Sequence, residues 1–320
     1  METIETLQTI TRLSRDIITA LRREHPGGIT QNHARFLVDE YYAIQKARIR
    51  NSNYSKGLDR DAAKSGTEAE PHTAIDSFVS NYQVGEENIK KLLQWYLDEH
   101  PMLWFFENTL GIGPVLAAGL LAHIDIALCP TVGHIWSFAG LNPSVTWDKG
   151  QKRPWNTPLK TLCWKIGDSF VKLSNRGDAF YGQVYRARKQ AEWQHNLAGD
   201  YRAAAEQSMS NKKYGKATDQ YAWYTGQCSA ELAKAMLAEG KTPTVPGCKA
   251  DDDGFPMLSP AHIDARARRY AVKLFLSHLH ECWYRQHFGE EPPKPFAISI
   301  QGHAHYIPPP QLGLMTAKAA

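Results

Sequence analysis

The 320-residue sequence lacks several features that define whole classes of proteins. It contains no apolar run of about eighteen residues, so no transmembrane helix and no membrane partner are expected. Its first residues, Met1–Glu5, have neither a basic start nor an apolar core, so no secretory signal is expected. Its five cysteines are an odd number at scattered positions, which argues against a disulfide framework. Together these absences predict a cytoplasmic protein.

The overall composition is ordinary for a globular protein. Apolar residues make up 42% of the chain and charged residues 22%. The length allows one large or two medium domains with a substantial core. Since the net charge is only +4, the distribution of charge along the chain is more informative than its total.

Hydrophobic periodicity predicts a mainly α fold, a helical bundle. Apolar residues recur at three- and four-residue spacing, and Pro or Gly punctuates the repeats. Thr30 is a candidate N-cap, and Pro260 opens a long helix to about Phe288. The pattern predicts an N-terminal helical region (1–50), a flexible polar linker (51–73), a helical domain (74–290) and a proline-rich tail (291–320).

The stretch Leu110–His123 predicts a helix-hairpin-helix motif. Gly111 and Gly113 flank Ile112, and Pro114 suits the first turn of the following helix. We expect the main-chain amides of these three residues to hold a phosphate at the positive end of that helix. The alternative interpretation is a tight Gly-Pro turn between two core helices.

Positive charge is concentrated after this stretch. Residues 144–216 contain fourteen Lys and Arg against six Asp and Glu, a net charge of +8. Aromatic residues such as Trp164 lie among them, and we expect most of these in the core. Phosphate neutralisation dominates nucleic-acid affinity, so DNA binding with a steep salt dependence is predicted. The candidate DNA contacts are Lys149, Lys152, Arg153 and Lys160, with Arg266, Arg269 and Lys273 as a second stripe.

A zinc site is the alternative chemical interpretation of the C-terminal region. His278 and Cys282 are four residues apart on the long helix, and His303 and His305 follow in the tail. A structural zinc site needs four ligands at paired short spacings, and this arrangement does not match that pattern. We therefore predict structural histidines and no metal.

The order of two motifs resembles a known family. Gly111-Ile-Gly-Pro114 is followed by Leu120-Leu-Ala122 and then by Phe138-Ala-Gly-Leu-Asn-Pro143. Over about residues 104–190 the chain resembles the C-terminal domain of the insertion-sequence 110/116/902 transposases, which are related to the Piv-like DNA invertases. The resemblance implies a DNA-binding protein of a mobile genetic element that acts in DNA transposition or site-specific recombination on duplex or branched DNA, with possible self-association.

The same resemblance leaves strand cleavage open. Family members carry an N-terminal RuvC-like domain with four metal-binding acids, whereas residues 1–100 here predict helices. The family also supplies a catalytic serine after the second motif, and its counterpart here is Ser144, outside the usual Ser-Gly pair. Mg²⁺ is expected only for an active recombinase. The alternatives are a catalytically inactive DNA-binding protein and a helical scaffold for an acidic protein partner.

Overall fold

The computed structural model describes residues 11–67, 72–211, 214–215, 218–225, 235, 238–240, 253–293 and 306–311. The prediction of a mainly α fold is confirmed, and no β-strand occurs within these ranges. None of the described helices combines the length and the apolar character needed to cross a membrane. The chain forms two compact units, Met1–Pro130 with Trp283–Glu290, and Thr131–Cys282 with Glu291–Ala320.

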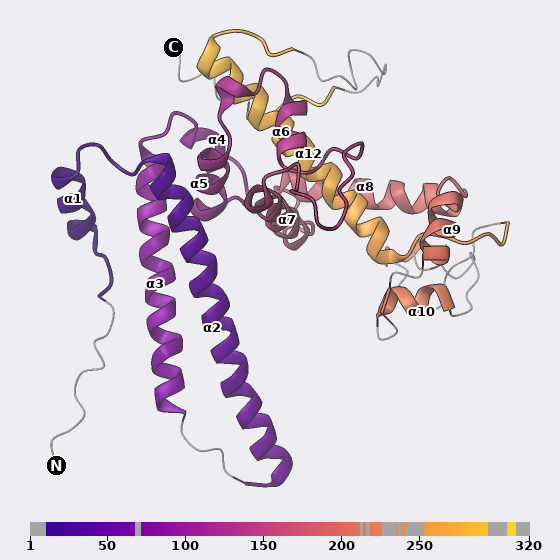
Figure 1. Cartoon of the computed structure of the whole chain (residues 1–320), viewed down its shortest axis with the longest axis horizontal. Coiled ribbons are helices and arrows are strands. Elements are labelled where there is room, and N and C mark those ends of the chain that lie inside the picture. The colour runs from indigo at the N-terminus through magenta and orange to yellow at the C-terminus, as the bar shows by residue number, and fades with distance from the viewer. Residues whose placement is uncertain are drawn as a thin grey trace. The chain divides into compact units, whose positions relative to one another are not determined.

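The first unit is built on a long antiparallel helix pair (Figure 1). Its helices are α1 (Arg15–Glu24), α2 (Gln31–Ser65), α3 (Thr73–Asp98), α4 (Leu103–Glu107) and α5 (Pro114–His123), followed by the short 3-10 helix η1 (Ile126–Leu128).

The apolar helix α5 packs against both α2 and α3. Seven of its ten residues are buried, including Ala117 and Ala118, whose small side chains allow close approach. From α2, the Nε of Arg35 donates to the Ala122 carbonyl at 2.5 Å, which satisfies one of the carbonyls left open where α5 ends.

The predicted linker is largely helical, so that prediction is wrong for residues 51–65. Thr30 caps α2 as expected, accepting from the His33 N–H, but the helix then continues to Ser65 and ends at Gly66 in the left-handed conformation. Two polar contacts tie this segment to the start of α3: the Ser55 hydroxyl donates to Asp76 at 3.4 Å, and Asp59 lies 3.4 Å from His72, the N-cap of α3. Such tertiary contacts can outweigh a weakly helical composition.

The second unit contains α6 (Val132–Phe138), α7 (Thr157–Lys172), α8 (Phe180–Leu197), α9 (Arg202–Asn211), α10 (Asp219–Thr225) and most of α12. Helix α12 spans Pro260–Phe288, the bounds predicted from the sequence. An aromatic cluster joins three of these helices: the ring centre of Phe170 lies 5.0 Å from that of Tyr181 and 5.6 Å from that of Phe275. This cluster holds α7, α8 and α12 together.

Candidate nucleic-acid interface

Helix α7 has a core face and a second face that carries charge. Asn156 caps its first turn by accepting from the Leu159 N–H at 2.9 Å. The core face buries residues at helical spacing, whereas Lys160, Trp164 and Asp168 follow one another every four residues on a different face. Trp164 is 62% exposed, so it is an exception to the expectation that most of the aromatic residues in this segment lie in the core.

Helix α12 lies close to this second face of α7. A Cβ atom on Gly167 would be 3.3 Å from the Val272 side chain and 3.5 Å from the Arg268 Cβ, which marks a close crossing of the two helices. Beside the crossing is a groove of about 490 Å³. We call it the α7–α12 groove; its charged and aromatic lining residues are Lys160, Trp164, Asp264, Arg268 and Arg269.

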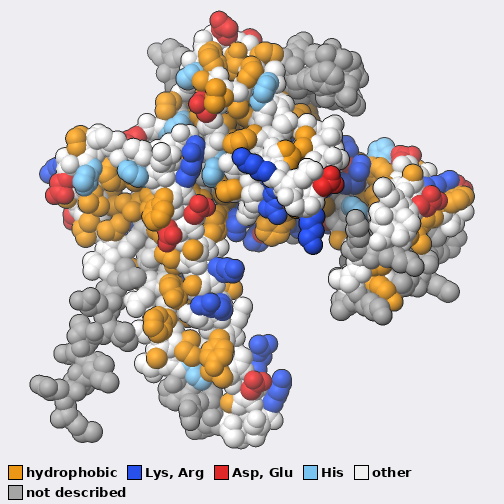
Figure 2. Space-filling model, in the orientation of Figure 1, with side chains coloured by type: hydrophobic (Ala, Val, Ile, Leu, Met, Phe, Trp, Pro, Cys, Tyr) orange, Lys and Arg blue, Asp and Glu red, His pale blue; other side chains and the backbone are white. Residues whose placement is uncertain are grey.

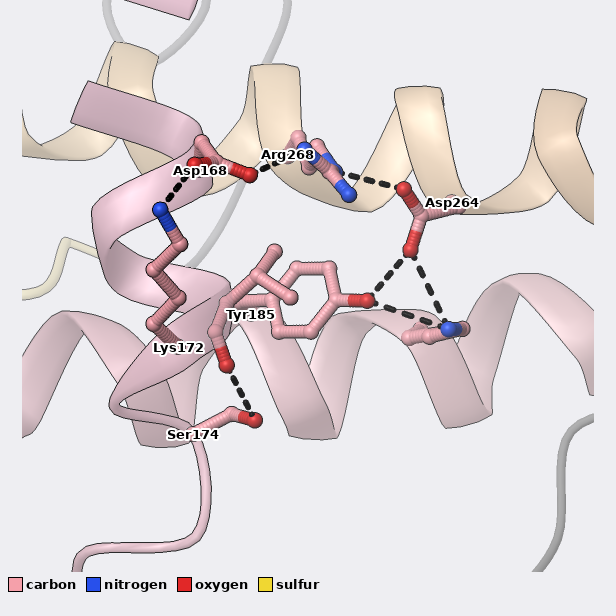
Figure 3. Close-up of polar contacts among 8 residues, drawn as sticks. Asp168, Lys172, Ser174, Tyr185, Asp264 and Arg268 are labelled. Carbon is pink, nitrogen blue, oxygen red and sulfur yellow. Dashed lines mark hydrogen bonds and ion pairs between the residues drawn. The ribbon is translucent and has the colours of Figure 1, made fainter. Parts of the chain in front are cut away.

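A network of ion pairs, which we call the floor network, joins α7 and α12 at the groove (Figure 3). Arg268 bonds Asp264 on its own helix at 2.5 Å and approaches Asp168 of α7 at 3.4 Å. Asp168 in turn pairs with Lys172 at 2.7 Å. Because two carboxylates surround it, Arg268 is a fixed part of the floor network.

The carboxylate of Asp264 is also held from α8. Tyr185 donates its hydroxyl to it, and the Nζ of Lys189 lies 3.1 Å from the same oxygen. Burial alone raises the pKa of Asp264, but the hydrogen bond from Tyr185 and the charges of Lys189 and Arg268 together lower it. Asp264 is therefore an anion that anchors α8 to α12.

Three further cations lie at or near the groove, Lys160 and Arg269 of its lining and Arg153 of the preceding loop, and we call them the rim cations. Partial burial and the charges of Arg153 and Arg269 lower the pKa of Lys160. Burial and the charge of Arg266 lower the pKa of Arg269. Among the described residues, no carboxylate forms an ion pair with Lys160, Arg153 or Arg269. Lys160 therefore lies in the electrostatic field of two further cations, Arg153 and Arg269.

Other residues that the sequence predicts to contact DNA lie on the loop before α7. Lys149 and Lys152 are exposed, and Arg153 lies with its guanidinium carbon 5.2 Å from the centre of the Trp147 ring. Trp147 stabilises the loop by donating from Nε1 to the Gln151 carbonyl at 2.7 Å. Figure 2 shows Lys and Arg side chains gathered over α7, this loop and the neighbouring part of α12.

Two further predicted DNA contacts on α12, Arg266 and Lys273, lie against aromatic rings. The Nε of Arg266 lies 2.5 Å from Glu192, a carboxylate residue that is only 1% exposed, and its guanidinium covers the Tyr201 ring. Lys273 lies with its Nζ 4.0 Å from the centre of the Trp136 ring, and burial lowers its pKa. Arg266 is therefore neutralised within the fold, which argues against its part in the predicted DNA-binding stripe, whereas the DNA contact of Lys273 stays a prediction.

The predicted hairpin belongs to the first unit and does not present three open amides. Ile112 is 7% exposed, and its N–H donates to the Thr109 carbonyl at 3.3 Å. The prediction that this amide holds a phosphate is wrong, because its hydrogen bond is already made within the turn. Gly111 adopts a φ of 92°, and Gly113 is the exposed N-cap of α5. The preceding helix α4 has only five residues.

The catalytic candidate Ser144 lies exposed at the start of the loop. Its backbone N–H donates to Asn142 Oδ1 at 3.0 Å, which forms a local turn. The described ranges contain no group of three or more His, Cys, Asp or Glu that could hold a metal ion. A role of Ser144 in cleavage stays a prediction.

His278, one of the residues considered as a zinc ligand, is part of the core. His278 is 1% exposed, and its Nε2 donates to the Ile307 carbonyl at 2.9 Å. Its Nδ1 therefore accepts from the Tyr181 hydroxyl at 2.8 Å, since a carbonyl can only accept. Both ring nitrogens are used, and burial lowers the pKa of His278 to about 4. His303 and His305 lie outside the described residues.

Comparisons with family models, curated proteins and solved structures find no significant match for the chain.

Sequence reasoning missed Trp164 and Arg268 as lining residues of the groove. A signal for Trp164 was available, because the α7 repeat of Leu159, Leu162 and Ile166 places residue 164 on another side of the helix. No comparable signal existed for Arg268, since its partner Asp168 is a hundred positions away in the sequence.

Proposed function

We propose that this protein binds DNA by its phosphate backbone at the rim of the α7–α12 groove. Lys160 and Arg269 line the groove, and Arg153 acts on the Lys160 charge from the preceding loop. Lys149 and Lys152 on the same loop would extend the contact along a strand. Such contacts bind phosphate without reading the base sequence.

The convergence of rim cations from two distant segments carries this proposal. Arg153 and Arg269 both disfavour the charged form of Lys160 in the unbound protein, and a phosphate near the three cations would attract all of them. In contrast, Arg268 in the floor network already has two carboxylate partners. The rim cations therefore suit a partner with a row of negative charges.

The biological role is proposed from the family resemblance. A DNA-binding protein of a mobile element, acting in transposition or recombination, fits both the motif order and a backbone-binding rim. The predicted hairpin would make a second, weaker contact with DNA through Gly113, which is exposed at the start of α5. That contact would use the amides of the first helical turn.

The test is a salt titration of DNA binding measured by fluorescence anisotropy with a labelled duplex. Lys160→Gln and Arg269→Gln should each weaken binding and lower the slope of log K against log salt by about 1. The matched control is Arg176→Gln, which removes the same charge from an exposed residue paired with Asp178. Equal slopes for the rim variants, the control and the unaltered protein would contradict the proposal.

A further inference from the structure

We propose that the α7–α12 groove accepts an unstacked base of single-stranded nucleic acid, with Trp164 as the stacking surface. The inference rests on the proposed function, because the rim cations would hold the phosphates of the same strand. It adds a preference: the groove should bind a single strand, whose bases are unpaired, with higher affinity than an intact duplex.

The first observation is the state of Trp164. The residue is 62% exposed and belongs to the lining of the groove. Within the described part of the chain it makes no hydrogen bond or ring contact. In contrast, nearby Trp147 and Trp155 are occupied by Arg153 and Lys160 respectively. A large aromatic surface left open in a cationic site is what base stacking requires.

The second observation is the chemistry of the groove wall. Beside the charged residues, the lining is apolar or small, with Leu141, Cys163, Ala261, Ala265 and Val272. A phosphate alone gains nothing from such a wall, whereas the flat apolar face of a base does. The groove volume of about 490 Å³ lies within the range of sites for small organic groups, roughly 300–1,000 Å³.

The third observation is the position of Lys160 relative to the Trp164 ring. Lys160 and Trp164 are four residues apart on one helix, so they lie on the same face one turn apart. Arg269 comes to the same groove from α12. A base on Trp164 would thus have cations beside it for its own or the neighbouring phosphate. This combination of stacking and charge is typical of single-strand binding.

The experiment compares three probes of similar phosphate number: a short thymidine oligonucleotide, an oligomer of the same length made entirely of abasic units, and a duplex. Trp164→Ala should lower affinity for the thymidine strand by about 5- to 150-fold, the usual value of base–aromatic stacking. Trp164→Phe should retain most of the affinity. Affinity for the abasic strand and the duplex should change by less than about twofold.

The control for the loss of an exposed aromatic residue is Tyr54→Ala on α2, which should leave all three affinities unchanged. Circular dichroism and urea unfolding check that each variant folds. An equal loss on thymidine and abasic strands, or no loss on either, would overturn the stacking inference. Loss of binding in Lys160→Gln reports separately on the proposed function, because that variant leaves Trp164 in place.

Discussion

The ammonium nitrogen of Lys160 lies 3.7 Å from the centre of the Trp155 ring. This cation–π contact fixes where the rim charge is presented at the groove. Both side chains lie against Gly140, where a Cβ atom would be 2.8 Å from Trp155 Cγ and 3.0 Å from Lys160 Cδ. The position of the cation therefore depends on the absence of a side chain at residue 140.

Gly140→Ala tests this dependence. Gly140 has a φ of 64°, so alanine would be strained and would push the Trp155 ring away. We expect a loss of about 1–3 kcal/mol in the free energy of unfolding and weaker DNA binding. Urea unfolding and anisotropy measure the two effects. Gly177→Ala is the control, since its Cβ would meet nothing within 4 Å; equal behaviour of the two variants would contradict the role of Gly140.

Arg266 and Arg269 should differ although they are three residues apart. Arg266→Gln leaves the buried carboxylate of Glu192 with one fewer cation, so we expect about 1–3 kcal/mol of destabilisation. Arg269→Gln should change stability little and DNA affinity more, because Arg269 faces the groove. Thermal unfolding and a salt titration of both variants separate these roles, and a reversed pattern would show that the two residues have been assigned the wrong way round.

Gly113 offers a test of the hairpin. Asp and Asn both suit its N-cap position, where φ is −85° and ψ is 178°, so neither Gly113→Asp nor Gly113→Asn should unfold the protein. If the first turn of α5 holds a phosphate, the aspartate variant should bind DNA several-fold more weakly than the asparagine variant, since only the carboxylate repels a phosphate. Equal affinities in anisotropy would remove the hairpin from the interface.

His278 predicts a pH dependence of stability. Burial lowers its pKa from 6.5 to about 4, so between these values the unfolded chain binds a proton that the folded chain does not. The free energy of unfolding should therefore fall by about 1–3 kcal/mol as the pH drops from 6.5 to 4.

Urea unfolding across this pH range measures the effect. His278→Gln can still donate to the Ile307 carbonyl and accept from Tyr181, so it should fold and lose the share of the pH dependence due to His278. The exposed His25→Gln serves as the control. An unchanged pH profile in His278→Gln would show that other groups cause the dependence.

Local features of the fold could be predicted from the chain alone. The bounds of α12, the cap at Thr30 and the core face of α7 follow from residues within a turn or two of each other. Helical periodicity, proline placement and capping act over this short range, so the order of residues is enough to predict them.

Only the tertiary structure decided which cations are neutralised by a carboxylate. Arg266 and Arg269 look alike in the sequence, yet Glu192, 74 positions from Arg266, forms an ion pair with Arg266 and not with Arg269. The charge of Arg269 acts on Lys160 although the two residues are more than a hundred positions apart, and Ser55 in the predicted linker bonds Asp76 of α3. Whether a charge is neutralised depends on which carboxylate the fold brings within a few ångströms, because electrostatic attraction falls with distance in space and not along the chain.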